Sequence, residues 1–400
     1  MILHTCLFAL TAVASTLAFV SLFYVALLAL VGSVWKSEGD SHPIKHLPRT
    51  RFVMLIPAHN EEHGIVPTLE SIRALNYSPD LLRVIVIADN CSDRTADVVR
   101  GMGAECWERT ALTAPGKGQA LRWALERLPP ESIDAVAFID ADSRVDTQFL
   151  LEMDRGIQQG AVALQGQYGF DLADSSNFSL LMFASKQSEN NLFWRPRQRF
   201  GWPGFIVGNG FCLSRQTIES VPWAAYSIVE DVEYSIQLAL RNFPVRFIET
   251  ARVSSRPTRR VADAGPQRLR WASGTFRVMR QYVPKLVRAS FRQRSLQLVE
   301  MAIALILTSR FLAAYLLVVA SLGSVALGAS GVVLYLRFTV IASFLLLAIY
   351  VGTVLSQIPK TYGSRLKPLV ALPLYTCWML LVHIAAAVGL RRDVWVRTAR

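Results

Sequence analysis

The stretch Arg51-Phe-Val-Met-Leu-Ile-Pro-Ala-His-Asn-Glu-Glu62 decides the fold, because a continuous apolar run passes directly into a polar cluster. Such a run predicts a buried strand, and residues 83–88 repeat it after a predicted helix at 64–75. The same alternation continues, with helices predicted at 93–103, 117–128 and 147–158 and strands at 135–139 and 161–170. Apolar strands alternating with helices indicate an α/β domain with a parallel sheet covered on both faces.

Uncharged segments flank this domain. The chain is 52% hydrophobic, yet residues 1–35 and 368–390 carry no Asp, Glu, Lys or Arg, and residues 296–358 carry three. About 20 apolar residues cross a bilayer core as a helix, so residues 1–35 predict an N-terminal transmembrane anchor. Residues 298–390 predict a C-terminal membrane region of two or three spans, in which 368–390 either spans or lies in the interface. A cleaved signal peptide is the alternative for the first segment, but the run is long and has no basic start.

The net charge of +12 is distributed unevenly. Residues 36–251 sum to −6, whereas Arg252 to Arg294 hold 12 basic residues and one acid. This distribution disfavours nucleic acid as a partner and favours membrane lipids beside the basic strip. Basic residues directly after the first apolar segment, together with the positive-inside rule, place the following domain in the cytoplasm. We therefore expect a multi-pass integral protein of the plasma or inner membrane that ends in a basic tail at 391–400.

Polar residues follow three predicted strands, where open sheets bind their ligands. They are residues 57–62, Asp89-Asn-Cys-Ser-Asp93 and Asp140-Ala-Asp142. Helix capping and turn formation are the alternative explanation for each cluster. Asp140 and Asp142 differ, because alternate positions of an extended segment do not both cap one helix. Two carboxylates at this spacing suit a divalent cation that also holds phosphates.

Six motifs together resemble family 2 glycosyltransferases in type and order. They are Pro57-Ala-His-Asn-Glu-Glu62, Ala88-Asp-Asn-Cys-Ser-Asp-Arg-Thr95, Gly116-Lys-Gly-Gln-Ala-Leu121, Asp140-Ala-Asp142, Glu230-Asp231 and Gln267-Arg-Leu-Arg-Trp271. The last motif resembles the membrane-embedded branch with cellulose, chitin, hyaluronan and poly-N-acetylglucosamine synthases and ceramide glucosyltransferase. The resemblance implies a Rossmann-like, nucleotide-sugar-binding GT-A domain at 48–250. Basic amphipathic interface helices would follow at 251–297.

The resemblance also implies a donor site. Asp89 would accept the ring N–H of uracil, and Lys117 would approach the nucleotide, where a cation beside phosphate is stabilising. Asp142 would ligate Mg²⁺ or Mn²⁺, and Asp140 would face the ribose or the same metal. The remaining donor-binding residues implied by the resemblance are Pro57, Asn60, Glu61, Gln267 and Arg270.

Asp231 resembles the general base of the family, with Glu230 orienting it. A single displacement by the deprotonated acceptor would invert the anomeric carbon and give a β-linkage. The alternative for both acids is an ordinary helix N-terminus, where acids are favoured. Trp271, Trp202 and Asn209 are the implied acceptor-binding residues, since an aromatic ring offers a flat apolar face to a sugar.

The acceptor divides the functional prediction. The Gln-x-x-Arg-Trp motif favours a growing exopolysaccharide chain, which we predict first. The few apolar segments favour a single addition to a lipid, such as a polyprenyl-diphosphate sugar or ceramide. Arg195, Arg197 and Arg199 are expected to bind a lipid phosphate or diphosphate. A non-catalytic membrane scaffold is the alternative from another class, and the full set of candidate carboxylates argues against it.

Overall fold

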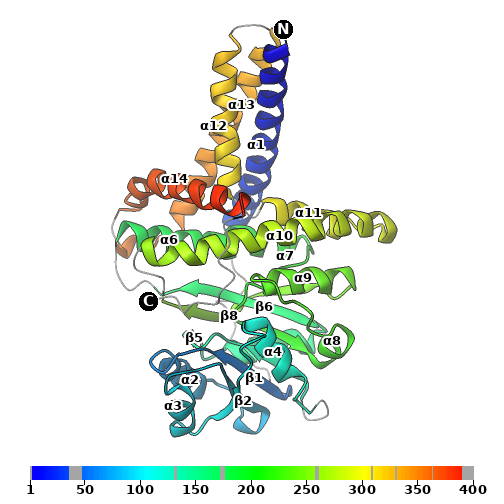
Figure 1. The fold of residues 1–400 in the computed structure, drawn as a ribbon, viewed down its shortest axis with the longest axis vertical. Coiled ribbons are helices and arrows are strands. Elements are labelled where there is room, and N and C mark those ends of the chain that lie inside the picture. Colours follow the sequence, from blue (N-terminus) through cyan, green and yellow to red (C-terminus); the bar gives the residue numbers. More distant parts are fainter. Residues whose placement is uncertain are drawn as a thin grey trace.

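The computed structural model describes residues 2–35, 47–129, 133–171, 176–256, 261–307, 310–328, 331–362 and 364–389. Figure 1 shows three levels: a sheet domain, a layer of helices lying across it, and three upright helices. The predicted basic tail at 391–400 lies outside the described residues.

The domain is built on one sheet of eight strands in the order β3-β2-β1-β4-β7-β6-β8-β5. The strands are β1 (Phe52–Ala58), β2 (Leu82–Asp89), β3 (Glu105–Arg109), β4 (Ala135–Phe138), β5 (Ser143–Val145), β6 (Ala163–Phe170), β7 (Phe211–Ser214) and β8 (Val245–Ser255). In β1, Phe52, Met54 and Ile56 enter one core cluster, whereas Val53 and Leu55 enter the other. Both faces of the central strand are therefore buried, as its unbroken apolar run predicts.

The predicted wholly parallel sheet is wrong, because the sheet is mixed. Strands β1 to β4 pair in parallel, but β7 runs antiparallel to both β4 and β6, and β5 runs antiparallel to β8. An apolar run reports burial and carries no information on strand direction. Strands β3, β5, β7 and β8 were not predicted; β3 is only partly buried, and β5 and β7 have three and four residues.

Helices cover both faces of the sheet. Those of the domain are α2 (Ile65–Arg73), α3 (Thr95–Gly101), α4 (Lys117–Leu125), α5 (Phe149–Gln158), α8 (Arg215–Ser220) and α9 (Glu230–Leu240), with a short 3-10 turn at Pro79–Leu81. Helices α2 and α5 pack on one core cluster, and α4 and α9 pack on the other. Helix α9 lies on the side that faces the helical layer and contacts α10.

The layer and the upright helices contain the apolar segments. The layer comprises α6 (Asn177–Glu189), a π-helical segment (Asn190–Trp194), α7 (Arg195–Arg199), α10 (Val261–Gln293), α11 (Leu296–Leu307) and α14 (Pro368–Ala387). The upright helices are α1 (Ile2–Val34), α12 (Arg310–Ala326) and α13 (Gly331–Ser356), and a 3-10 turn (Lys360–Tyr362) precedes α14.

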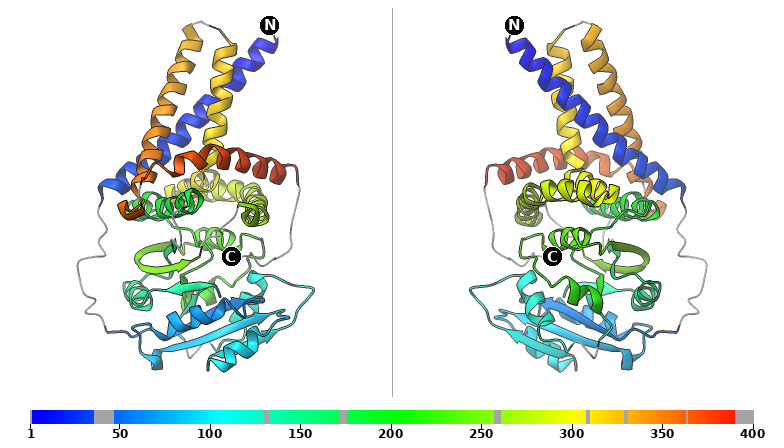
Figure 2. Two further views of the ribbon diagram at one scale, coloured as in Figure 1. Left: turned by 90° about the vertical axis from the view of Figure 1, so that its left-hand side faces the viewer. Right: turned by 90° about the vertical axis from the view of Figure 1, so that its right-hand side faces the viewer.

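Within the described residues, three helices are long and apolar enough to cross a membrane, namely Ile2–Val34, Val333–Ser356 and Pro368–Ala387. The first part of the predicted C-terminal membrane region forms two helices, α11 and α12, which are bent by 69° relative to each other. Helix α14 lies across the base of the upright helices in every view (Figures 1 and 2) and packs on α10 and α6. Helix α14 thus differs in direction from the upright helices, and both alternatives for residues 368–390 stay predictions.

A buried ion pair joins the domain to the apolar helices. Arg197 of α7 donates to Glu300 of α11 at 2.5 Å, and the hydroxyl of Tyr24 in α1 donates to the same carboxylate at 2.6 Å. Arg197 is fully buried, and its guanidinium lies over three aromatic rings.

The expectation that Arg195, Arg197 and Arg199 bind phosphate is not supported by their contacts. Arg195 pairs with Glu249 and donates to the carbonyl of Gly32, and Arg199 lies over the Trp35 ring. These side chains hold the domain against α1, which leaves Arg197 in particular with no solvent-facing surface for a ligand.

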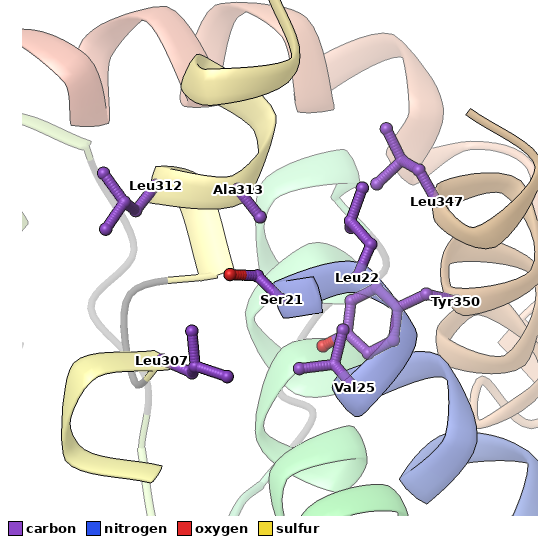
Figure 3. Close-up of a pocket in the computed structure, with 8 residues that line it drawn as sticks. All are labelled: Ser21, Leu22, Val25, Leu307, Leu312, Ala313, Leu347 and Tyr350. Carbon is purple, nitrogen blue, oxygen red and sulfur yellow. The ribbon is translucent and has the colours of Figure 1, made fainter. Parts of the chain in front are cut away.

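A small gap lies where α1, α11, α12 and α13 meet (Figure 3). Its volume is about 30 Å³, and its lining is mostly aliphatic, comprising Ser21, Leu22, Val25, Leu307, Leu312, Ala313, Leu347 and Tyr350. This is room for about one water molecule, so the gap is a packing feature of the helix junction.

Candidate active site

Two loops at the carboxyl edge of the sheet are joined by hydrogen bonds. The Asn60 Oδ1 accepts the Ser92 N–H at 2.8 Å, and the Glu61 N–H donates to Thr95 Oγ1 at 2.8 Å. Asn60 has a φ of 56°, a left-handed conformation that Asn tolerates better than most residues. The loops after β1 and β2 therefore brace each other, and this would hold the predicted donor-binding residues Asn60 and Glu61 in place.

Asp89 lies at the end of β2 and is fully buried. Its Oδ1 accepts from Arg109 of β3 and from Asn90, while its Oδ2 has no hydrogen-bond partner among the described residues. Burial raises the pKa of Asp89, and the Arg109 guanidinium opposes that shift. One buried acceptor oxygen thus remains for a donor such as a ring N–H.

Lys117, at the start of α4, connects two parts of the site. Its ammonium group donates to Asp140 and to the carbonyl of Gly208. Burial alone lowers the pKa of Lys117, but Asp140, Glu230 and Asp231 outweigh it and hold the pKa above the usual lysine range. The lysine is therefore a fixed positive charge among three carboxylates.

Asn209 lies behind the turn that carries Asp140 and Asp142. It is 1% exposed, its Oδ1 accepts the Asp140 N–H at 3.1 Å, and its Nδ2 donates to Ser143 Oγ at 2.8 Å. The side chain therefore braces this turn, and its acceptor role stays a prediction.

Asp142 and Glu61 lie on either side of Gly64. A Cβ added at Gly64 would collide with the Glu61 carboxylate and lie 3.7 Å from Asp142 Cβ. No group of three or more His, Cys, Asp or Glu side chains able to hold a metal occurs in the described part of the chain. Mg²⁺ commonly binds one or two carboxylates together with substrate phosphates, so Asp140 and Asp142 fit a metal held jointly with a donor.

Glu230 and Asp231 begin α9 on the opposite side of Lys117. Burial raises the pKa of both carboxyl groups; their mutual proximity adds to the shift of Glu230, and Lys117 opposes both shifts. The Asp231 Oδ2 lies 3.0 Å from the position of a Cβ on Gly208, whose φ of +79° favours glycine. The backbone at Gly208 therefore approaches the candidate base closely because it carries no side chain.

The Gln-x-x-Arg-Trp segment lies on α10, in the helical layer above these acids. A Cβ added at Gly274 would lie 3.2 Å from Val229, which directly precedes Glu230. Burial lowers the pKa of Arg270, and the charge of Glu230 opposes this. Arg270 and Gly274, four residues apart on one face of α10, thus turn toward the start of α9.

Trp271 is 39% exposed, and the Arg268 guanidinium lies 5.2 Å from its ring centre. The ring is therefore accessible, as an acceptor-binding residue would need to be. Trp202, in contrast, packs 4.9 Å from the Phe200 ring, which contacts Trp35 at the end of α1. Its described contacts are therefore with the junction to α1, and its acceptor role stays a prediction.

Two functional contacts were not predicted. Arg109 was missed because it lies on strand β3, which was not predicted. The available signal for this strand was the short run 105–109, which lies between the turn-forming residues Gly103 and Pro115. The close approach of Gly208 to Asp231 depends on tertiary contact and has no local signal. Pro57 is placed inside β1 beside Ile87, fully buried, so it shapes the strand end.

Known proteins share both the sequence and the fold. Residues 135–389 match the family described as glycosyl transferase family group 2. The chain is 28% identical over 292 residues to "Probable glycosyltransferase YdaM" of Bacillus subtilis, covering 67% of this chain and 68% of that protein. It is 26% identical over 230 residues to a beta-monoglucosyldiacylglycerol synthase of Trichormus variabilis, covering 56% of this chain and about half (48%) of that protein.

A solved structure has a similar architecture. The mannosyltransferase PcManGT from Pyrobaculum calidifontis, in complex with GDP-Man and Mn²⁺, superposes with a TM-score of 0.58 at 18% identity over 96% of this chain and 98% of that one. The fold is thus GT-A-like, an α/β domain with a mixed sheet and flanking apolar helices. With the family match covering more than half of its length, the chain belongs to glycosyl transferase family group 2.

Proposed function

We propose that this protein is a membrane-bound, inverting hexosyltransferase that moves a sugar from a nucleotide-sugar to the hydroxyl group of a membrane lipid. The observation that carries the proposal is the contact between α10 and the start of α9, at Gly274 and Val229. It places the candidate base Asp231 directly beneath the helical layer, where an acceptor held in a bilayer can arrive.

The donor would bind at the braced carboxyl edge of the sheet. Asp89 Oδ2 offers one buried acceptor, which suits the single ring N–H of uracil. Lys117, paired with Asp140, would be a fixed cation for the diphosphate, and Arg270, which is near enough to Glu230 to feel its charge, would be a second one. We infer a UDP-sugar from the chemistry of Asp89, whereas the solved mannosyltransferase holds GDP-Man. The donor screen described below therefore includes donors with both nucleotide bases.

Asp142, with Asp140, would hold Mg²⁺ or Mn²⁺, which supplies Lewis-acid neutralisation of the leaving diphosphate. Lys117 adds a second positive charge on the Asp140 side. Asn209 keeps the turn that presents both aspartates in place through the Asp140 backbone. The Mn²⁺ in the solved mannosyltransferase supports this assignment.

Asp231 would take the proton from the acceptor hydroxyl as that oxygen attacks the anomeric carbon. The raised pKa makes this carboxylate a stronger base than an exposed aspartate. Glu230 shares the recess and lies against Gly118, close to Lys117. A single displacement opposite the leaving group inverts the anomeric carbon, hence a β-linkage from an α-linked donor.

Two observations favour a lipid acceptor over the exopolysaccharide predicted first. Helix α14 lies across the base of the upright helices and covers α10 (Figure 2), where a polymer channel would have to begin. Two of its relatives are named beta-monoglucosyldiacylglycerol synthase, a glycolipid enzyme. The polysaccharide acceptor remains the second candidate, because the Gln267 to Trp271 motif is present on α10.

The test is a donor screen with the full chain in phospholipid vesicles that contain diacylglycerol. UDP-glucose, UDP-N-acetylglucosamine and GDP-mannose are offered with Mn²⁺, and nucleotide release and extracted lipids are measured. A singly glycosylated lipid supports the proposal, whereas a polymer ladder supports the second candidate. Asp231→Asn should abolish transfer, and Asp97→Asn, at an exposed carboxylate of α3, is the matched control. Equal transfer by both variants would overturn the assignment of the base.

A further inference from the structure

An apolar stripe on α11 faces outward. Leu296, Val299, Ile303 and Ile306 are exposed and recur every three or four residues, so they share one face of the helix. Leu296 is 82% exposed. The opposite face, with Met301 and Leu305, is buried against α10. The described protein therefore covers one side of α11 and leaves an aliphatic side open.

A basic surface adjoins this stripe. Lys285, Arg288 and Arg292 line a shallow hollow on the C-terminal half of α10, together with Ala289 and Gln293. No acidic residue occurs in the sequence between Asp263 and Glu300. Phe291, on the same turn, is 80% exposed. Three cations therefore line the hollow, and the exposed Phe291 ring lies on the same turn of α10 outside its lining.

The two features form one surface, the α10–α11 elbow, defined by residues 285–306. The helices meet at Arg294, whose φ of 51° reverses the chain, and α11 then packs beside α10. Figures 1 and 2 place both helices in the layer at the base of the upright helices. If those helices cross a bilayer, the elbow lies at the headgroup level of the same leaflet.

We propose that the α10–α11 elbow is a binding site for anionic phospholipids, separate from the active site. The aliphatic stripe and Phe291 would enter the acyl boundary, and the three cations would hold phosphate-bearing headgroups. An apolar face that adjoins a face of Lys and Arg residues is typical of helices that lie in the membrane interface. Charge complementarity selects an anionic lipid over a zwitterionic one, because each cation near an anionic surface adds a roughly five-fold preference.

The experiment uses the full chain in mixed micelles, with phosphatidylglycerol and phosphatidylcholine as the probes. Native mass spectrometry counts the lipids retained by the protein across a lipid titration. The wild type should retain phosphatidylglycerol preferentially. The triple variant Lys285→Gln, Arg288→Gln, Arg292→Gln should lose that preference by about one hundred-fold, the product of three five-fold factors.

A matched triple, Arg83→Gln, Arg100→Gln, Arg215→Gln, removes the same charge from exposed ion pairs of the domain. It should retain phosphatidylglycerol like the wild type. Equal loss in both triples would show a bulk charge effect and overturn the proposal, as would unchanged retention in the elbow triple. Thermal unfolding in phosphatidylcholine micelles shows that both triples are folded. Nucleotide release is measured in parallel, so failure of the elbow site is distinguishable from failure of the proposed reaction.

Discussion

Replacing Gly208 by alanine should displace the proposed base Asp231 and so lower the catalytic rate, in addition to lowering the stability of the protein. The residue has a φ of +79°, and a Cβ there would lie 3.0 Å from Asp231 Oδ2. Two costs follow: left-handed strain of about 1–2 kcal/mol for a residue with a Cβ, and displacement of the carboxylate to restore ordinary contact. The second cost falls on the proposed base, because the Gly208 carbonyl is held by Lys117 on the other side.

The size of the catalytic effect follows from the displacement. Ordinary contact begins near 3.4 Å, so the carboxylate must shift by a few tenths of an ångström. A misplacement of about 1 Å costs roughly one hundred-fold in rate, so we expect kcat to fall by roughly ten-fold with a smaller change in KM. The assay is nucleotide release at saturating donor, with thermal unfolding in detergent measured on the same preparations.

Gly160→Ala is the matched control. Gly160 has a φ of +84°, and a Cβ there meets nothing within 4 Å. This variant should lose a similar amount of stability and keep the wild-type kcat. Equal kcat values in Gly208→Ala and Gly160→Ala would refute the reasoning, because the contact with Asp231 would then have no catalytic consequence.

Three further predictions follow from the same contacts. Activity should fall as the pH decreases, because Asp231 acts as a base only when ionised; burial raises its pKa, so the midpoint of kcat/KM should lie above the ordinary aspartate value of about 4. A midpoint at or below 4 would contradict this. Chelation by EDTA should stop transfer, and Asp142→Asn should raise the Mn²⁺ concentration needed for half activity by ten-fold or more; an unchanged Mn²⁺ requirement would exclude this ligand. Arg197→Met should destabilise the protein by roughly 3–5 kcal/mol, because Glu300 stays buried without its partner. Adding Glu300→Leu should restore most of the lost stability, as measured by thermal unfolding. If the losses of stability caused by the two substitutions simply add, the proposed coupling between Arg197 and Glu300 is contradicted.

Local sequence predicted the elements whose signal is local. The apolar runs at 52–58 and 82–89 are the central strands, and the segment from Gln267 to Trp271 is helical. Strand direction was not predictable from burial, and β7, which runs antiparallel to both of its neighbours, was not predicted as a strand because it has only four residues. The bend between α11 and α12 was missed because both halves are equally apolar, and hydropathy does not report helix direction.

The candidate site shows the same limit. Asp140, Asp231 and Lys117 were predicted from motifs, and the structure brings them together through Lys117. The bracing contacts of Asn209 were not predicted, because its side-chain partners, Asp140 and Ser143, come from a distant part of the chain. Motifs identify residues near a site, and only tertiary contacts assign each one to binding or to bracing.

The buried pair of Arg197 and Glu300 has a consequence for biosynthesis. Arg197 leaves the ribosome about one hundred residues before its partner, so the nascent domain must carry an uncompensated cation until α11 has been made. Its early form should therefore be loose along α6 and α7 and exposed to chaperones and proteases. A fragment that stops at residue 250 would preserve this immature state, and the smallest unit that can mature extends past Glu300.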